Sequence, residues 1–290
     1  MALRIRRSIT LGAGVRRGPR GATYTVTASG PRGASAQPPP NWSIPSKPGV
    51  LASPHEREFF MGLEELKRGQ PELALERFET AARRDTRDRA LSDDLLAGLT
   101  AIHVRDAARA IPHLEVVVAS DAELPDELLL KYAPELAFEV SITPEVSALI
   151  AAGSMAAALA LVECYREVER QEEAVGLLQR LIDVDDDPAL KLSLCELYAQ
   201  AGDWDEIVEL GAVANEDDLT LRIILYRATA LAERGEDEEA LEVYQEALAS
   251  TKRSDELLKE ALYGRGRTYL RLGRNTEGRE DLAGLLDDDG

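Results

Sequence analysis

Few residues of this 290-residue chain have the types and spacing that catalysis or metal binding requires. Its only histidines are His55, His103 and His113, and none has a cysteine or an acid at the spacing of a zinc site. No Ser/His/Asp grouping, phosphate-binding loop or activated nucleophile is recognisable. Acidic residues are abundant, as on a solvated helical surface, so no acid–base pair stands out. The sequence therefore predicts no enzyme, no catalytic residues, no metal, no cofactor and no small-molecule substrate.

Two short segments imitate ligand-binding loops without completing them. Residues 183–194 begin like a calcium loop, but Pro188 and Leu194 replace the Gly and Glu that such a loop needs. An acidic turn before a helix explains this segment better, because the helix dipole favours acids there. Residues 12–18, GAGVRRG, have their third Gly one residue late for a dinucleotide loop, and no helix pattern follows. Neither segment predicts a ligand.

The compartment is predicted from what the chain can and cannot form. No run of 18 apolar residues exists, so no membrane-spanning helix is expected. Glycines interrupt the apolar stretch that follows Arg4, Arg6 and Arg7, and a secretory signal would not be broken in this way. Cys164 and Cys195 are too few for a disulfide framework and are expected to be buried small apolar residues. These observations predict a cytoplasmic protein.

A single pattern can be laid over most of the remaining chain. It reads Gly, four residues, Ala, three residues, an aromatic residue or Leu, two residues, Ala. We call the first residue of each copy its anchor; clear copies start at Gly69 and Gly235, and looser ones at Arg105, Glu169, Gly202 and Gly273. An anchor Gly ends one helix in a left-handed conformation, so that the next helix turns back. Small residues seven positions earlier, such as Gly62 and Gly98, let the two helices approach closely.

A period near 34 with this residue order resembles the tetratricopeptide repeat family. The resemblance implies an all-α, right-handed solenoid of about six helical hairpins, with repeats 1–2 in residues 54–121 and repeats 3–6 in residues 154–286. One hairpin cannot bury its apolar face alone, so stacked neighbours must supply the core. The expected helices are 55–67, 71–84, 90–104, 106–119, 154–168, 171–182, 188–201, 204–214, 219–234, 236–249, 256–272 and 275–286.

The resemblance also implies where a partner would bind. In the family the first helix of each hairpin lines a concave face. The residues in the inward positions are Glu163, Glu196, Gln200, Arg222, Leu225, Thr229, Tyr263, Arg267 and Arg271. Some members hold a C-terminal carboxylate with paired Lys and Asn, and the corresponding residues here do not form that clamp.

Three of these arginines suggest a polarity for binding. Arg267 and Arg271 lie one helical turn apart, and Arg222 of the preceding repeat could join them in a basic spot for an acidic partner. The other interpretation is a solvated surface in which the arginines offset Glu260 and neighbouring acids.

Charge separates the first fifty residues from the rest. They carry seven Arg, one Lys and no acid, a net +8, whereas the remainder has a net −27. Residues 1–30 alternate apolar and polar side chains as short strands do, and they resemble a short bacterial N-terminal domain of unknown function. A Pro-rich linker follows over 31–53. We expect a β-like or disordered basic arm, which could contact nucleic acid or a membrane surface or fold against its own acidic scaffold.

An insertion over residues 122–153 separates the second and third repeats. Leu136, Phe138, Val140 and Ile142 alternate with polar residues, which predicts a strand-like segment. Two interpretations remain open: a hairpin docked on the repeats, or an exposed strand edge that pairs with another chain. The whole pattern predicts an interaction scaffold for a protein or peptide partner. The alternative is nucleic-acid or membrane association through the basic arm, with the repeats as a regulatory or oligomerisation module.

Overall fold

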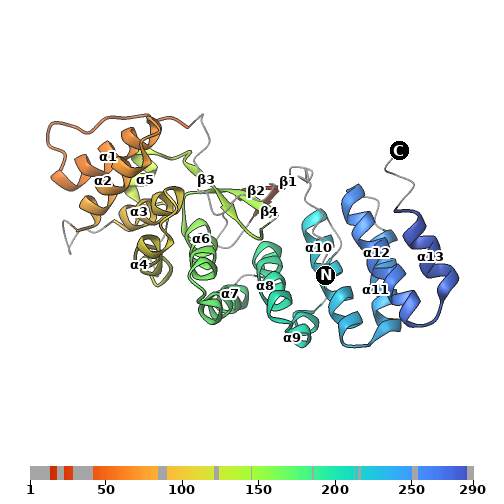
Figure 1. The fold of residues 1–290 in the computed structure, drawn as a ribbon. Helices are drawn as coiled ribbons and strands as arrows, with labels where there is room; N and C mark the ends of the chain where they lie inside the picture. The colour runs from red at the N-terminus through yellow and green to blue at the C-terminus, as the bar shows by residue number, and fades with distance from the viewer. Residues whose placement is uncertain are drawn as a thin grey trace. The chain divides into compact units, whose positions relative to one another are not determined.

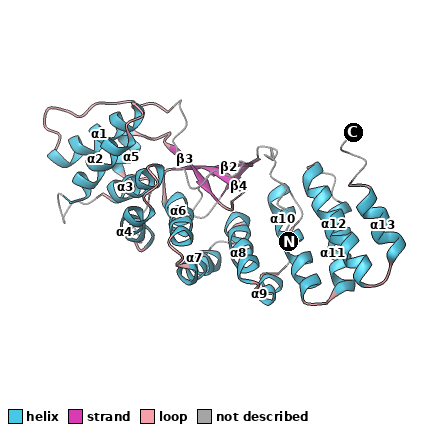
Figure 2. Cartoon of the chain, in the orientation of Figure 1, coloured by secondary structure: helices cyan, strands magenta, loops and turns pink. Residues whose placement is uncertain are grey.

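Helices dominate the computed structural model, which also contains one small sheet (Figures 1 and 2). The chain forms two compact units, residues 1–185 and 186–290, which we call unit 1 and unit 2. The structure describes residues 14–17, 23–28, 42–83, 90–120, 124–144, 146–184, 186–211, 213–214, 217–249 and 254–285.

Unit 1 contains three helical hairpins and the insertion. The hairpins are α1 (Pro54–Lys67) with α2 (Pro71–Arg83), α3 (Leu91–His103) with α4 (Ala107–Val118), and α6 (Ser154–Glu167) with α7 (Gln171–Val184). The insertion forms α5 (Glu127–Tyr132), β3 (Ala137–Ser141) and β4 (Val146–Ala151). Helix α4 packs directly against α6, so the insertion loops out without breaking the stack of repeats.

Unit 2 contains three further hairpins. They are α8 (Pro188–Ala201) with α9 (Trp204–Glu209), α10 (Asp218–Glu233) with α11 (Asp237–Ala249), and α12 (Asp255–Arg271) with α13 (Asn275–Ala283). Helix α10 packs against both α8 and α12, the first helices of the neighbouring hairpins. The predicted all-α class of repeated helical hairpins is confirmed, and the handedness of the superhelix stays a prediction.

The anchors explain where the first helices end. All six have positive φ: Gly69 74°, Arg105 63°, Glu169 60°, Gly202 81°, Gly235 82° and Gly273 76°. Arg105 and Glu169 adopt this conformation without being glycine, which places the looser copies in the same register as the clear ones. Helix α9 is shorter than expected because Gly211, with φ 79°, takes the left-handed conformation just after it.

Small residues allow the two helices of a hairpin to approach closely, as predicted. A Cβ atom on Gly62 would lie 2.5 Å from the Phe78 ring, and one on Gly98 would lie 2.5 Å from the side chain of Leu114. Both contacts join the small position of a first helix to the aromatic or Leu position of its partner. Side-chain caps start the helices, for example Ser53, whose hydroxyl accepts the N–H of Glu56 over 3.1 Å.

The strands form one antiparallel sheet within unit 1, in the order β1 (Gly14–Arg17), β2 (Thr23–Ala28), β4, β3. Strand β2 pairs with β4 so that Thr25 lies opposite Leu149, and β3 pairs with the other edge of β4. The β3–β4 hairpin also packs on α6. This contact favours the interpretation of the insertion as a hairpin docked on the repeats.

The sheet and α5 add detail to what the sequence predicts. Residues 14–17 and 23–28 of the N-terminal segment share a sheet with the insertion. The part of the predicted strand-like segment that precedes residue 14 lies outside the described residues. The strand-like segment predicted in the insertion is present as β3 and β4, and residues 127–132 of the insertion also form α5, whose N-cap is Asp126. These six residues are too few for helical periodicity to be recognised.

Candidate protein-interaction surface

The insertion covers one side of α1, the first helix of unit 1. We use the term first-helix face for the positions thirteen, ten, six and three residues before each anchor. In α1 this face begins with Glu56, whose Oε1 accepts hydrogen bonds from Lys131 Nζ over 2.6 Å and from the Tyr132 hydroxyl over 2.5 Å. The ring of Tyr132 lies 6.4 Å from Phe59 and 5.6 Å from Phe60, centroid to centroid. Phe59 and Tyr132 are both fully buried, so this face has no room for a partner.

The insertion also contacts the start of α3. Asp126 accepts the backbone N–H of Ser92 over 2.9 Å, and its other oxygen caps α5. Leu95 and Leu99, which lie on the first-helix face of α3, are fully buried. In unit 1 the first-helix face of the first two repeats is therefore part of the core.

Asp93 of α3 is fully buried and forms a hydrogen bond with Nε2 of His55 from α1. The hydrogen bond to Asp93 raises the pKa of His55, and burial raises the pKa of Asp93 to about 6. This pair resembles the His–Asp pairs of hydrolases in composition, but Asp93 is sealed from solvent and the contact joins two packed helices. The geometry thus gives His55 a structural role.

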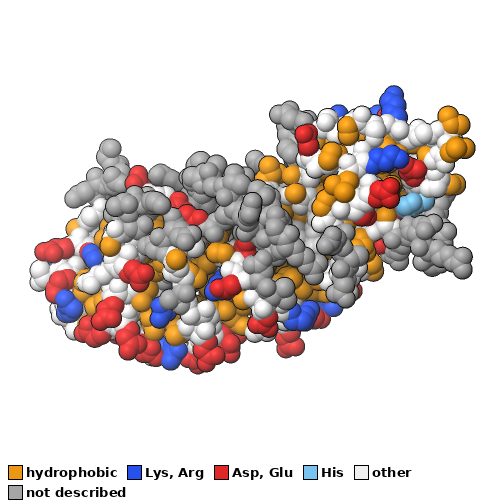
Figure 3. Space-filling model, turned by 180° about the vertical axis from the view of Figure 1, so that it is seen from behind, with side chains coloured by type: hydrophobic (Ala, Val, Ile, Leu, Met, Phe, Trp, Pro, Cys, Tyr) orange, Lys and Arg blue, Asp and Glu red, His pale blue; other side chains and the backbone are white. Residues whose placement is uncertain are grey.

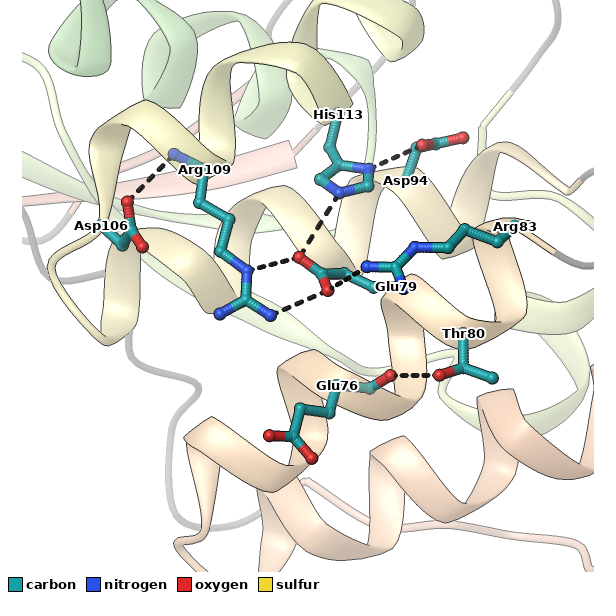
Figure 4. A network of polar contacts seen from close by, with 8 residues as sticks. All are labelled: Glu76, Glu79, Thr80, Arg83, Asp94, Asp106, Arg109 and His113. Atoms are coloured by element: carbon teal, nitrogen blue, oxygen red, sulfur yellow. Dashed lines mark hydrogen bonds and ion pairs between the residues drawn. The ribbon is translucent and has the colours of Figure 1, made fainter.

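A polar network joins the first and second hairpins (Figure 4). Glu79 of α2 receives hydrogen bonds from Arg109 of α4 over 2.5 and 2.8 Å, and from Arg83 over 2.8 Å. The Arg109 guanidinium is the main reason why the pKa of Glu79 is lowered. His113 points toward the same carboxylate and forms a 2.8 Å hydrogen bond with the buried Asp94. These contacts hold the repeats together.

Helix α12 of unit 2 presents the same face to solvent. Tyr263 is 49% exposed and Leu270 is 37% exposed, ten and three residues before the anchor Gly273. Arg267 lies between them and is also exposed. Its guanidinium carbon lies 5.7 Å from the centre of the Tyr263 ring, in a cation–π contact. The result is a stripe of aromatic, cationic and aliphatic side chains along one side of the helix, which we call the α12 stripe.

Tyr244 of α11 links the α12 stripe to α10. Its hydroxyl lies 3.1 Å from that of Thr229, and Arg267 and Arg271 of α12 interact electrostatically with it. Burial raises the pKa of Tyr244, and the hydrogen bond with Thr229 acts in the opposite direction. In the repeat pattern Tyr244 occupies the aromatic position nine residues after the anchor Gly235, which predicts packing only. Its tight fit against Gly264, where a Cβ atom would overlap the ring, places the hydroxyl here.

These repeats share left-handed anchors at intervals of 33 to 38 residues in their best-matched part, and small residues pack against the aromatic or Leu position of the partner helix. The chain has a tetratricopeptide-like fold. No protein-family model matches it, and no curated protein matches its sequence.

Three solved structures align with most of the chain. The N-terminal domain of the EccA1 ATPase from the ESX-1 secretion system of Mycobacterium tuberculosis has a TM-score of 0.52 and 12% identity, over 81% of this chain and 84% of that one. A tetratricopeptide repeat protein from Parabacteroides merdae has a TM-score of 0.48 and 14% identity, over 81% of this chain and 80% of that one. The thermophilic repeat protein TTC0263 of Thermus thermophilus has a TM-score of 0.36 and 17% identity, over 72% and 98%.

The other predicted partner-binding residues are less available to a partner than Tyr263 and Arg267. Leu225 is buried in the core between α10, α11 and α12 and offers almost no surface. Arg222 is 9% exposed, and its Nε and Nη2 have no hydrogen-bond partner among the described residues. Arg271 forms an ion pair with Asp237 of α11, so its charge is already offset.

Three more predicted residues belong to local contacts. Glu196 of α8 accepts hydrogen bonds from the Tyr226 hydroxyl and, over 2.7 Å, from Gln200. Glu163 belongs to α6 in unit 1, where it pairs with Arg166 over 3.2 Å and burial raises its pKa. Of the predicted residues, Thr229, Arg267 and Arg271 interact with Tyr244, and Tyr263 contacts Arg267.

The described residues contain no group of three or more His, Cys, Asp or Glu that could hold a metal ion. Within the same part of the chain, no helix combines the length and apolar character needed to cross a bilayer. Cys164 and Cys195 are buried, as predicted for small apolar residues, and burial raises the pKa of Cys195 to about 12. A thiol with so high a pKa is a poor nucleophile at neutral pH.

Proposed function

We propose that this chain is a non-catalytic scaffold that binds a peptide or protein segment on the first-helix face of unit 2. The observation that carries the proposal is the contrast between two equivalent helices. Phe59 and Leu66 of α1 are buried, whereas Tyr263 and Leu270, in the same positions of α12, are 49% and 37% exposed. Exposed apolar side chains in a row on one helix are a common docking feature.

The distribution of polar contacts supports this assignment. Arg265 forms a two-bond ion pair with Asp281 of α13 and so joins the two helices of one hairpin. Arg271 pairs with Asp237 of α11 and so joins neighbouring hairpins. Arg267 stacks on the ring of Tyr263 and forms no ion pair with any described residue. In the left part of Figure 3, where unit 2 lies, acidic side chains gather along the lower rim. A cationic and apolar stripe differs from that acidic surface and is suited to a specific partner.

A comparison of matched variants tests the proposal. Peptides selected from a displayed library for binding to the full chain are titrated against Tyr263→Ser/Leu270→Ser by fluorescence anisotropy. The expected loss is about tenfold or more, because two apolar anchors together contribute on the order of 2 kcal/mol. The control is Leu73→Ser/Leu130→Ser, which alters two exposed leucines of unit 1 and should change affinity less than about twofold. Equal losses in both variants would contradict the proposal, as would the absence of any selected peptide.

A further inference from the structure

Unit 1 shows how this chain covers a first-helix face with a short helix. Leu129 and Tyr132 of α5 are 1% and 0% exposed, and Tyr132 fills the space beside Phe59. Lys131 adds a charged contact to Glu56 over 2.6 Å. The cover is therefore a short helix with an apolar pair and one charge that matches the face beneath it.

The α12 stripe matches the first-helix face of α1 position by position, with one change in side-chain type. Tyr263 and Leu270 occupy the positions of the buried Phe59 and Leu66, so an apolar anchor would meet similar side chains. Between them, however, α12 has Arg267. A cover for α12 must therefore offer a group that accepts hydrogen bonds from a guanidinium.

The position of Arg267 favours a carboxylate. In the described part of the chain it has no ion pair, and its stacking on Tyr263 restricts the guanidinium without using its N–H donors. Arg271, one turn further along, is neutralised by Asp237, so it does not compete strongly for an anion. A partner carboxylate could accept two parallel N–H bonds from Arg267 while neighbouring apolar groups pack on the tyrosine and leucine.

We infer that the partner of the α12 stripe is a short helical segment that presents a carboxylate beside aliphatic or aromatic side chains. This inference rests on the proposed function and specifies the chemistry of its partner. Compared with α5, such a segment keeps an apolar pair and adds an acid, since α12 has Arg267 at the position that the buried Leu63 occupies in α1. Helical segments of this kind bind grooves through anchors spaced three, four or seven residues apart.

A charge-exchange selection tests the inference with the full chain. A displayed library of helix-forming peptides with randomised surface positions is selected separately against the natural chain and against Arg267→Glu. Arg279→Glu is the matched control, because it makes the same change in charge at an exposed position of α13. The natural chain and the control should enrich Asp or Glu next to apolar residues, whereas Arg267→Glu should enrich Lys or Arg there. A peptide selected on the natural chain should lose about tenfold affinity on Arg267→Glu and less than about twofold on the control.

The outcomes separate this inference from the proposed function. Selected peptides that bind the α12 stripe, as shown by loss of binding to Tyr263→Ser/Leu270→Ser, yet carry no acids would overturn the acidic partner alone. Selection of the same sequences by Arg267→Glu and Arg279→Glu would also overturn the acidic partner. If binding is insensitive to Tyr263→Ser/Leu270→Ser, or if no peptide is enriched, the proposed function itself fails.

Discussion

The hydroxyl of Tyr132 donates a hydrogen bond to Oε1 of Glu56 across 76 positions of sequence. Tyr132 belongs to the insertion, and Glu56 lies at the start of the first repeat. This contact, together with Lys131 on the same carboxylate, fastens the insertion to α1. The insertion is therefore a structural part of unit 1. It covers on α1 the positions whose equivalents on α12 of unit 2 are exposed to solvent.

We expect Tyr132→Ala to destabilise the full chain by about 3–5 kcal/mol, because it removes a fully buried aromatic side chain. Tyr132→Phe keeps the ring and loses the hydrogen bond, so it should cost about 1–2 kcal/mol. Tyr263→Ala, at a half-exposed tyrosine, should cost less than about 1 kcal/mol. Urea unfolding followed by circular dichroism measures all three. A cost for Tyr132→Ala no greater than that for Tyr263→Ala would show that the insertion is not fastened to α1.

The His55–Asp93 pair makes stability depend on pH. The pKa of His55 is raised, chiefly by the hydrogen bond with Asp93, and also by the charges of Asp126 and Glu56. The folded chain therefore holds the His55 proton more tightly than the unfolded chain does. Its contribution to stability is fully present below the unfolded pKa of about 6.5 and is lost as the pH rises through the raised pKa. The pKa of Asp93 is raised to about 6, so the folded chain also holds the Asp93 proton more tightly than the unfolded chain does. The stability that this proton contributes is lost as the pH rises from the unfolded value of about 4 through 6.

An Asp93→Asn variant tests this dependence. NMR titration of the ring protons should show a raised pKa for His55 in the natural chain and a lower one in the variant. His103 is the internal control, because burial lowers its pKa and Asp93 is not among the causes. Urea unfolding should show that the fall in stability above pH 6.5 becomes shallower in Asp93→Asn. If stability falls equally steeply with pH in the two proteins, the His55–Asp93 pair does not cause the pH dependence.

Two glycines inside helices should respond to alanine with opposite signs. At Gly264 a Cβ atom would lie 2.4 Å from the ring of Tyr244, so Gly264→Ala should destabilise the chain by about 1–3 kcal/mol. At Gly176 the nearest atom is the end of the Arg180 side chain at 3.7 Å, so Gly176→Ala should stabilise it by about 0.5–1 kcal/mol. Thermal unfolding of the two variants distinguishes the cases. Equal effects would mean that Tyr244 does not pack against Gly264.

The sequence predicts the repeats well because their signals are local. Gly69, Gly202, Gly235 and Gly273 mark helix ends through a conformation that glycine adopts at little cost, and the structure has each of them at positive φ. Arg105 and Glu169 could be placed only by their spacing from such glycines, since neither residue favours that conformation. Spacing was sufficient in both cases, because the repeat fixes the register.

The sequence could not predict the contacts that distinguish unit 1 from unit 2. The segment around Tyr132 has no helical period long enough to detect, and its partner Glu56 is far away in the chain. The same holds for Tyr244, whose hydroxyl meets Thr229 only after α10, α11 and α12 pack together. Resemblance to a repeat family predicts the same role for equivalent positions in every repeat. In the structure Phe59 is buried and Tyr263 is exposed, so only Tyr263 offers surface to a partner.

Hydroxyl-radical footprinting of the full chain, alone and with a selected peptide, tests the central claim most directly. Tyr263 and Leu270 should be oxidised readily in the free protein and be protected several-fold in the complex. Leu73 and Leu130, which are 48% and 58% exposed in unit 1, should be oxidised equally in both states. Protection of the unit 1 leucines, with Tyr263 and Leu270 unchanged, would contradict the assignment of partner binding to the first-helix face of unit 2.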